Sequence, residues 1–408
     1  MTMICPISYG AGRMAAHYAT ALKDQGHDVH IAYARDVAAD DQCGTSILPE
    51  MHAIGITSQL VPDLANYVNP FRRNPLIQIA RESKFDIIIS NTLRDAPASM
   101  QAAKQLGIPG IVFAQNMPRF TGLPGLRSLK RWLYLKTLRD VATHVICVAH
   151  GVARELVESC GIPQNQVSVS PNGLDLKSIP PEPPGNRAAV RAEFGLTNEL
   201  LLINLARIHE QKGQKYLVEA IRMLRDAGDC PRFKLLIVGD VETAKEKALK
   251  AQLQEYVQTH GLEQHVEFSG FRSDGYRLLQ AADLFVLSSV WEGLPLVVLE
   301  AMGVECPVLM TEYGDRFSDF RDGVDGLYVK VRDSKALADG LRQLLKSGDE
   351  SRREMGHHGR AYVEKHLTME RGKQLFVQYV EDVLRQRRIV QKSSTDRSRS
   401  AERRQILS

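Results

Sequence analysis

Residues 282–311 read ADLFVLSSVWEGLPLVVLEAMGVECPVLMT, and the order of elements in this stretch decides the fold. The apolar run 284–287 predicts a strand buried on both faces, residues 288–291 a turn, and residues 294–302 a helix. A strand followed directly by a helix is the repeating unit of parallel sheets covered by helices. The stretch also places two carboxylates, Glu292 and Glu300, on either side of the strand-to-helix junction.

The predicted start of this helix favours anions. Free backbone N–H groups are expected there, the positive end of the helix dipole attracts negative charge, and a glycine lets a ligand approach closely. These positions are Gly293, Leu294, Pro295 and Leu296. Glu300 is expected roughly 12 Å further along the axis, at about 1.5 Å per residue. Two acceptors at this separation predict an extended ligand whose hydroxyls they bind at its two ends, with a diphosphate between them.

Apolar strand-like runs alternate with helical segments along the whole chain, which predicts parallel sheets in an α/β fold. The expected strands are 3–7, 29–33, 87–90, 111–114, 145–148 and 167–170 in the first half, and 200–205, 233–238, 266–269, 284–287, 308–310 and 327–329 in the second. The proline-rich segment 179–186, IPPEPPGN, interrupts this alternation. We therefore predict an N-terminal domain over 1–180, a linker over 181–186 and a C-terminal domain over 187–368.

Composition agrees with a protein of two domains outside the membrane. The chain has 408 residues, of which 44% are hydrophobic and 25% charged, with a net charge of +4. It contains no run of eighteen uncharged apolar residues, and its first residues lack the build of a signal peptide, so a cytoplasmic protein is expected. The cysteines form no C-x-x-C pair and predict reduced thiols.

Five segments together resemble a known family. They are LARIHEQKG (205–213), EGLPLVVLEAM (292–302), PNGLD (171–175), VEFSGFRSD (266–274) and DGVDGLYV (322–329). The chain resembles the retaining, nucleotide-sugar-dependent glycosyltransferases of family 4. The resemblance implies the GT-B architecture, with two doubly wound Rossmann-like domains that face each other across a cleft. It also implies that a final helix, over 369–390, crosses back to the N-terminal domain.

In that family the first Glu of the E-x7-E segment meets the hydroxyls of the donor sugar and the second meets the ribose, so the resemblance gives these roles to Glu292 and Glu300. Arg207 and Lys212 follow the first strand of the second half, where open α/β sheets bind ligands. Fixed cations there stabilise the charge that develops on a departing diphosphate. The backbone of Gly270, Phe271 and Arg272 is expected to meet the base.

A glycine-rich segment near the N-terminus allows a different interpretation. Gly10 and Gly12 fit the pattern G-x-G-x-x-A, with Asp36 where a ribose-binding acid is expected, so an NAD-binding domain is the alternative. The preceding strand is short and contains Pro6. The resemblance instead implies that Gly10 and Gly12 belong to a phosphate or acceptor loop in the first β–α turn. We favour this hypothesis over an NAD-binding site.

The chain departs from the family pattern on the acceptor side. Gln115 and Asn116 stand where the family commonly has a histidine near the reacting sugar, and His150 follows a later strand. Arg316, in YGDRFS, either reaches a phosphate or braces its loop. The chain contains no D-x-D, the metal-binding pair of the other common transferase architecture, so no metal and no cofactor are expected.

Basic residues gather in two places. Residues 119–139 carry six basic residues and no acidic one, interleaved with Leu, Trp, Tyr and Phe. This is either an amphipathic helix on an anionic membrane surface or a core helix with a solvated basic face. The tail 391–408 is rich in Ser and Arg and is expected to be disordered. No nucleic-acid partner is expected.

The resemblance implies a hexosyltransferase, and the missing D-x-D predicts that it works without a metal. A cytoplasmic protein is expected, peripheral on the inner face of the cytoplasmic membrane where residues 119–139 form a membrane-surface helix. It would transfer a hexosyl unit with retention from a nucleotide sugar, expected to be a UDP-hexose with GDP-mannose as the alternative. The acceptor would be a glycan or lipid-linked molecule of envelope polysaccharide, exopolysaccharide or lipopolysaccharide synthesis. The rival hypotheses are a GT-B epimerase or phosphorylase, which would share the fold, a non-catalytic nucleotide-sugar-binding GT-B scaffold, and an NAD-binding Rossmann protein.

Overall fold

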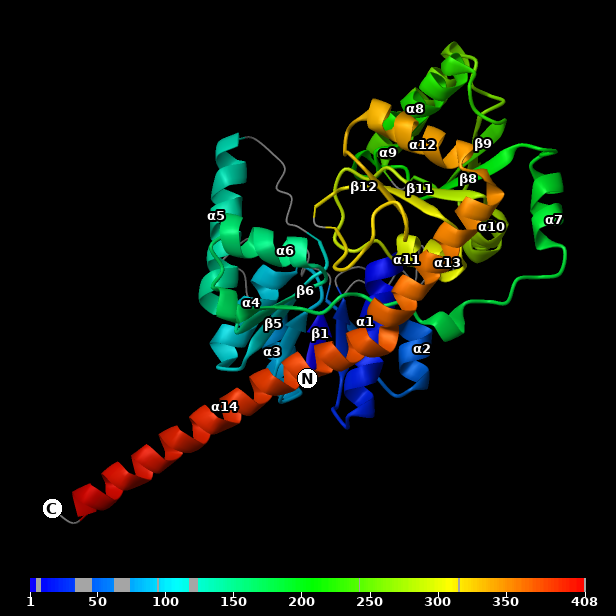
Figure 1. The fold of residues 1–408 in the computed structure, drawn as a ribbon. Coiled ribbons are helices and arrows are strands. Elements are labelled where there is room, and N and C mark those ends of the chain that lie inside the picture. The colour runs from blue at the N-terminus through cyan, green and yellow to red at the C-terminus, as the bar shows by residue number, and fades with distance from the viewer. Residues whose placement is uncertain are drawn as a thin grey trace. The chain divides into compact units, whose positions relative to one another are not determined.

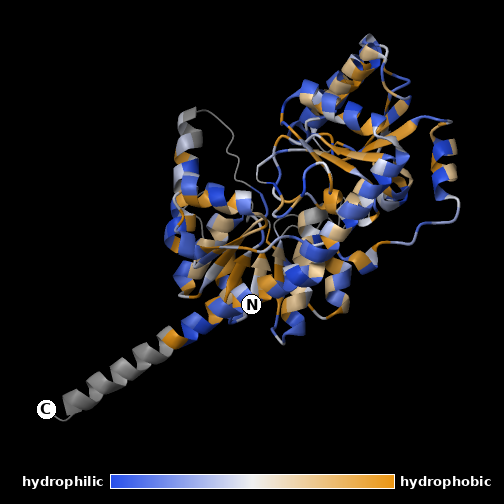
Figure 2. Cartoon of the chain, viewed as in Figure 1, coloured by the Kyte–Doolittle hydropathy of each residue, from blue (hydrophilic) through white to orange (hydrophobic). Residues whose placement is uncertain are grey.

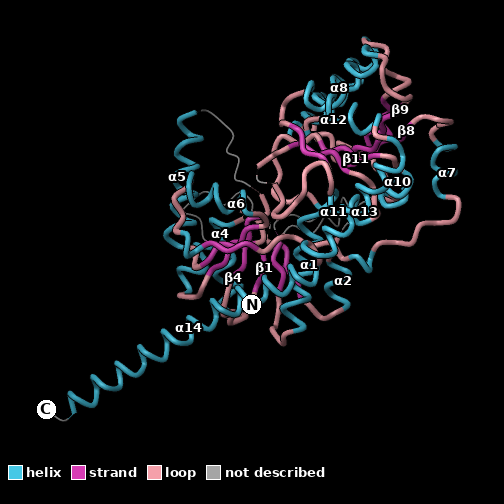
Figure 3. Tube along the Cα trace, in the orientation of Figure 1, coloured by secondary structure: helices cyan, strands magenta, loops and turns pink. Residues whose placement is uncertain are grey.

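A computed structural model describes residues 1–4, 9–33, 46–61, 74–93, 95–116, 124–241, 243–314 and 316–406 (Figure 1). The chain forms two units. The first unit contains residues 1–171 and 372–408, and the second unit contains residues 172–371. Each unit is built on a parallel sheet with helices around it (Figure 3).

The first unit has the strand order β3-β2-β1-β4-β5-β6-β7, and the pairs found between its described strands are all parallel. The strands are β1 (Thr2–Ile4), β2 (His30–Tyr33), β3 (Thr57–Leu60), β4 (Ile88–Ser90), β5 (Gly110–Ala114), β6 (His144–Cys147) and β7 (Val167–Val169). The helices are α1 (Tyr9–Asp24), α2 (Leu48–Ala53), α3 (Pro75–Glu82), α4 (Ala96–Leu106), α5 (Pro124–Val141), α6 (His150–Arg154) and, at the C-terminus, α14 (Met369–Ile406).

Helix α14 is fastened to the first unit by aromatic packing and by hydrogen bonds. The ring of Phe376 stacks on Tyr18 of α1 with centroids 4.3 Å apart, and the edge of Phe113 on β5 meets Tyr18 at 5.1 Å. All three side chains are fully buried. Ser170 donates to the carbonyl of Gly372 at 3.1 Å. This packing holds the C-terminal helix against the first sheet.

Helix α14 also continues through residues 391–406, where the sequence analysis predicted a disordered tail. The physical reason is local. After Gly372 the chain contains no Gly or Pro that would stop a helix, and its Lys, Arg, Gln and Ala residues favour one.

The second unit has the strand order β10-β9-β8-β11-β12-β13, again with parallel pairs between the described strands. The strands are β8 (Leu200–Leu205), β9 (Phe233–Val238), β10 (Val266–Gly270), β11 (Leu284–Leu287), β12 (Val308–Thr311) and β13 (Leu327–Val329). The helices are α7 (Asn186–Glu193), α8 (Gln214–Ala227), α9 (Ala244–Thr259), α10 (Gly275–Ala281), α11 (Leu296–Gly303), α12 (Ser334–Lys346) and α13 (Gly348–His366). This is the doubly wound Rossmann order, in which the strand sequence reverses between β8 and β11.

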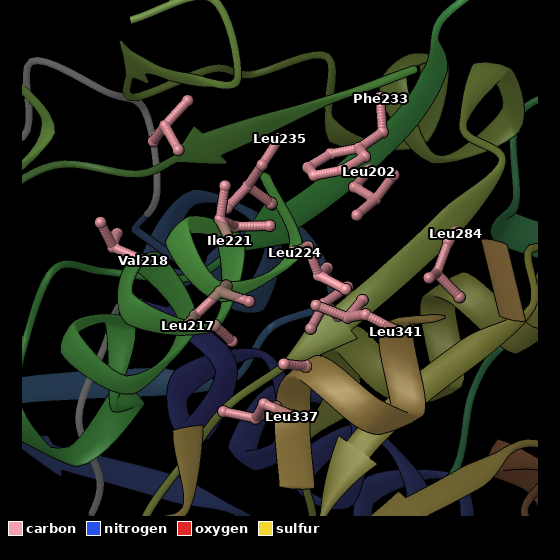
Figure 4. Close-up of a cluster of buried hydrophobic side chains, with 14 of the residues drawn as sticks. Leu202, Leu217, Val218, Ile221, Leu224, Phe233, Leu235, Leu284, Leu337 and Leu341 are labelled. Atoms are coloured by element: carbon pink, nitrogen blue, oxygen red, sulfur yellow. The ribbon is translucent and has the colours of Figure 1, made fainter. Parts of the chain in front are cut away.

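Helices α8 and α12 cover one face of this sheet because both repeat apolar residues at helical spacing. The buried series on α8 is Leu217, Ile221 and Leu224, and the series on α12 is Leu337, Leu341 and Leu344. Figure 4 shows these helices packed over Leu202, Leu235 and Leu284 of the strands. In Figure 2 the strands are correspondingly hydrophobic and the helices are mixed. Each fully buried leucine stabilises the fold by about 1.5–3 kcal/mol.

The division between the units does not fall at the predicted linker. The proline-rich segment 179–186 lies inside the second unit, which begins at Asn172. The N–H of Leu174 donates to Leu367 at 2.8 Å, and a Cβ on Gly173 would lie 2.2 Å from the carbonyl oxygen of Thr368. Backbone pairing, and not proline content, therefore joins residues 172–178 to the second unit.

Candidate functional site

Two loops of the second unit meet where the strand order reverses. One loop follows β8 and covers residues 206–213, and the other follows β11 and covers 288–295. The N–H of Val290 donates to the carbonyl of Gln211 at 2.7 Å, and the hydroxyl of Ser288 donates to the carbonyl of Lys212 at 2.8 Å. Ligands of open α/β sheets bind at the carboxyl ends of the strands beside this switch point.

Gly213 permits this approach for two reasons. Its φ is +64°, a left-handed conformation that other residues rarely adopt, and a Cβ there would lie 2.1 Å from the carbonyl oxygen of Ser288. The backbones of the two loops are therefore in contact, and side chains from both loops lie in the same site.

Glu292 lies in the second of these loops and not at the first turn of a helix. The prediction of a helix from residue 294 was wrong, because α11 begins at Leu296 with Pro295 at its N-cap. Helical geometry is disfavoured for a residue that precedes proline, so Leu294 stays outside the helix. Gly293 and Leu294 are buried, and Glu300 is buried within α11. The expected spacing of Glu292 and Glu300 along one helix axis therefore does not apply.

The carboxylate of Glu292 is held by three side chains. Its Oε1 lies 2.6 Å from Nζ of Lys212 and accepts from the hydroxyl of Ser289 at 2.7 Å. Its Oε2 accepts from Nε2 of Gln211 at 3.2 Å. The side chains of Lys212 and Glu292 are only 19% and 7% exposed, so water screens this ion pair weakly. The structure thus brings together two of the predicted residues, Lys212 and Glu292.

Arg207 has a different carboxylate partner. Its Nε lies 3.5 Å from Oε1 of Glu246, whose side chain is buried on α9. Glu246 also closes a capping box with Thr243 at the start of that helix. Glu246, Gln211 and Ser289 are site residues that the sequence does not predict. The T-x-x-E pattern of 243–246 was a readable signal for the cap, but no sequence pattern connects it to Arg207.

His209 lies between the two predicted cations and is held neutral. Its Nδ1 accepts a hydrogen bond from the N–H of Gln211 at 3.0 Å. Burial and then the charge of Arg207 lower the pKa of His209 below its ordinary value. A neutral imidazole is needed here, because a protonated Nδ1 has no lone pair to accept that bond.

At the end of β10 the side chain of Arg272 braces its own loop. It donates from Nε and Nη2 to Asp274, both at 2.8 Å, and from Nη1 to Glu193 at 2.6 Å. These hydrogen bonds raise the pKa of Arg272. Gly270 has a φ of +72°, and Phe271 is 47% exposed. The role of their backbone toward a base stays a prediction.

The loop after β12 is braced in a similar way. Arg316 donates to Glu312 and to Asp322, each at 3.0 Å, and its guanidinium lies over the ring of Tyr328. Of the two roles considered for Arg316, the structure supports the bracing of its loop. In the same loop the hydroxyl of Tyr313 is buried without a hydrogen-bond partner among the described residues.

The predicted glycine loop of the first unit is largely helical. Gly10 and Gly12 lie in the first turn of α1, which begins at Tyr9, and residues 5–8 before it lie outside the described residues. Alanines and long side chains from Ala11 onward favour helix strongly enough to include both glycines. The expected turn is therefore shorter than the G-x-G pattern. Asp36, the expected ribose-binding acid, also lies outside the described residues.

Of the possible acceptor-side residues, Gln115 is buried and lies within hydrogen-bond distance of Asn91. Its Nε2 lies 3.4 Å from Oδ1 of Asn91, whose own amide donates to the carbonyl of Ala11 on α1 at 3.1 Å. Asn91 follows β4 and was not singled out from the sequence. Asn116 and His150 are exposed, and His150 begins helix α6.

Helix α5 contains most of the basic stretch 119–139, whose residues 119–123 lie outside the described residues. Leu129 and Trp132 are 53% and 55% exposed. Arg131 and Lys136 are exposed as well, whereas Leu138 is fully buried. Among the described residues, no helix has the length and apolar character needed to cross a membrane.

Comparisons with known proteins match both halves of the chain. Residues 9–178 match the model "Glycosyltransferase Family 4", and residues 186–362 match the model "Glycosyl transferases group 1". The UDP-Gal:alpha-D-GlcNAc-diphosphoundecaprenol alpha-1,3-galactosyltransferase of Escherichia coli is 26% identical over 65% of this chain and 68% of its own. The D-inositol 3-phosphate glycosyltransferase of Nocardia farcinica is 36% identical over 49% of this chain and 44% of its own.

Solved structures agree on the fold. Alr3699/HepE of Anabaena in complex with UDP-glucose superposes with a TM-score of 0.76 at 19% identity, over 93% of this chain and 99% of that chain. The two parallel-sheet units and the matches to two glycosyltransferase family models are consistent with this fold. The chain therefore belongs to the group 1 and family 4 glycosyltransferases of the GT-B fold.

Proposed function

We propose that this glycosyltransferase moves a hexosyl unit from a UDP-hexose to a glycan or lipid-linked acceptor in the synthesis of an envelope polysaccharide, exopolysaccharide or lipopolysaccharide. The observation that carries the proposal is the cluster of Lys212, Gln211 and Ser289 around the carboxylate of Glu292 at the switch point of the second sheet. A relative named as a galactosyltransferase that acts on a diphosphoundecaprenol acceptor, and a structural neighbour solved with UDP-glucose, support this substrate class.

In the proposed reaction Glu292 orients the hexose, Glu300 binds the ribose, and Arg207 with Lys212 bind the diphosphate. The acceptor hydroxyl attacks the anomeric carbon from the face that the nucleotide leaves. The new C–O bond forms as the bond to the β-phosphate oxygen breaks, and that oxygen takes the electron pair and the acceptor's proton. The configuration is retained. Cationic side chains supply the charge stabilisation, so no metal is required in this proposal.

The first test is the melting temperature with UDP, GDP, ADP and NAD. A ligand that binds only the folded state raises stability by about 2.7 kcal/mol at a hundred times its dissociation constant. We expect a rise with UDP that exceeds the rise with the other three, in EDTA as in Mg²⁺. A rise with NAD alone would contradict the proposal, and a larger rise with GDP would change the donor to a GDP-sugar.

The second test is the change Glu292→Ala. We expect transfer and donor hydrolysis to fall about 10²-fold or more, since a misplaced sugar loses its reactive geometry. The anomeric configuration of the wild-type product, read by NMR, tests retention. Unchanged donor hydrolysis in a folded Glu292→Ala variant would contradict the proposal that Glu292 orients the donor sugar.

We further propose that the enzyme acts on the cytoplasmic face of a membrane, where it meets a lipid-linked acceptor. The exposed Leu129, Trp132, Arg131 and Lys136 on helix α5 support this location, because such a combination suits the interface of an anionic bilayer.

A further inference from the structure

Gln211 contacts three consecutive residues of the loop that carries Glu292. Its carbonyl accepts the N–H of Val290 at 2.7 Å. Its side-chain Nε2 donates to the carbonyl of Trp291 at 2.9 Å and to Oε2 of Glu292 at 3.2 Å. Both side-chain contacts require a donor, so the amide nitrogen, and not its oxygen, must face the loop.

The two oxygens of Glu292 have partners of different kinds. Oε1 meets the charged Lys212 and the hydroxyl of Ser289, whereas Oε2 meets the neutral amide of Gln211. In the proposed reaction Lys212 also meets the diphosphate, so its contact with Glu292 is shared or lost when donor binds. Gln211 has no charge to offer a phosphate and keeps its contact. It therefore restrains the rotation of the carboxylate in both states.

Gln211 is itself fixed from behind by its own loop. Its N–H donates to Nδ1 of His209 at 3.0 Å, and the next N–H, from Lys212, donates to the carbonyl of His209 at 2.8 Å. The backbone of Gln211 is thus held within the first loop, and its side-chain amide is hydrogen-bonded to the second loop. The position of the first loop therefore restrains the position of Glu292 in the second.

We propose that Gln211 is a positioning residue for the transfer reaction, whose amide holds the carboxylate of Glu292 in the orientation that binds the donor sugar. This inference rests on the proposed function, in which Glu292 meets the sugar. It makes the identity of residue 211 a determinant of turnover and not of diphosphate binding.

The test compares Gln211→Glu with Gln211→Ala across pH. At neutral pH a glutamate at 211 repels Glu292 and donates nothing, so we expect kcat to fall about tenfold or more while the melting shift with UDP is kept. On acidification the new carboxyl gains a proton and becomes a donor. The ratio of the kcat of Gln211→Glu to that of wild type should therefore rise as pH falls. Gln211→Ala has no donor at any pH and should show a constant, low ratio.

The matched control is Gln254→Glu on the exposed face of α9, which adds the same charge elsewhere and should leave the ratio at one. If the alanine variant does not fold, Gln211→Met replaces it, since it keeps the length of the side chain without a donor. A pH-independent ratio for Gln211→Glu, or wild-type kcat in Gln211→Ala or Gln211→Met, would overturn the inference. Its failure is separable from that of the proposed function, because Glu292→Ala would still lower transfer about 10²-fold or more.

Discussion

At the scale of single residues, the site consists of charges that already have partners. Lys212 is paired with Glu292 and Arg207 lies beside Glu246. A nucleotide diphosphate that binds these cations must either displace the protein's own carboxylates or bind the cations together with them. Removing one member of a weakly exposed pair leaves the other charge uncompensated, which is costly in a buried place. Variants of Lys212 and Glu292 therefore need a stability measurement beside each activity measurement.

Two tyrosines near this site should respond differently to loss of their hydroxyls. The Tyr313 hydroxyl is buried and has no partner in the part of the chain that the structure describes, and burial raises its pKa so that it stays protonated. The change Tyr313→Phe should therefore leave the free energy of unfolding unchanged or slightly higher. The Tyr328 hydroxyl accepts the N–H of Phe317 at 3.1 Å, so Tyr328→Phe should cost about 1 kcal/mol or more.

Chemical denaturation of the two variants beside wild type measures this difference. The result that contradicts it is a Tyr313→Phe variant as unstable as Tyr328→Phe, which would mean that the Tyr313 hydroxyl has a partner after all.

At the scale of elements, helix α5 presents an exposed mixture of apolar and basic side chains. Lys136 lies 5.0 Å from the centroid of the Trp132 ring, so the two side chains occupy one patch. The only acidic residue of the helix, Asp140, is paired with Arg139 at 2.8 Å. An aromatic ring beside cations suits the headgroup region of an anionic bilayer.

We expect the wild type to co-sediment with vesicles that contain phosphatidylglycerol and to be released by high salt. The double variant Arg131→Gln, Lys136→Gln should pellet less at low salt, because each cation near an anionic surface contributes about 1 kcal/mol. The exposed double variant Lys245→Gln, Lys335→Gln in the second unit is the control. Equal pelleting of all three proteins would indicate that α5 has a purely structural role.

At the scale of the whole molecule, three histidines give stability the same dependence on pH. Burial lowers the pKa of His30, His144 and His209 below the ordinary value of 6.5. The unfolded chain then binds protons more readily than the folded chain does. Their contribution to stability is complete above about pH 6.5 and is lost as pH falls through the lowered pKa values. The melting temperature should therefore decrease from about pH 7.5 to pH 5.5.

Thermal melts in buffers of equal ionic strength measure this slope. Replacing His144, whose ring contacts the hydroxyl of Ser168 at 2.9 Å, by Gln should make the slope shallower. A melting temperature that is flat or rises on acidification would show that raised pKa values elsewhere outweigh these three.

Elements that carry a local signal can be predicted from the sequence. Every strand of the second sheet is predicted within a residue or two of its observed position, because each is an apolar run between polar loops. Strand β3, TSQL, cannot be predicted in this way, because it is a half-exposed edge strand without an apolar run. Among the site contacts, Lys212 and Glu292 were expected in one site. The contacts made by Gln211, Ser289 and Glu246 depend on which loops the sheet order brings together, and no local pattern contains that order.

The backbone contact between Leu174 and residues 367–369 has a consequence for how such enzymes diversify. Leu174 bonds to Leu367 at 2.8 Å and to Met369 at 3.0 Å, so the second unit, one continuous segment, begins and ends at the same spot. Two crossovers in a gene, near the codons for these residues, would exchange the unit that contains Glu292 as a single cassette and keep the rest of the enzyme. Chimeras of related transferases should accordingly be joined at this pair of positions, and not at the proline-rich segment.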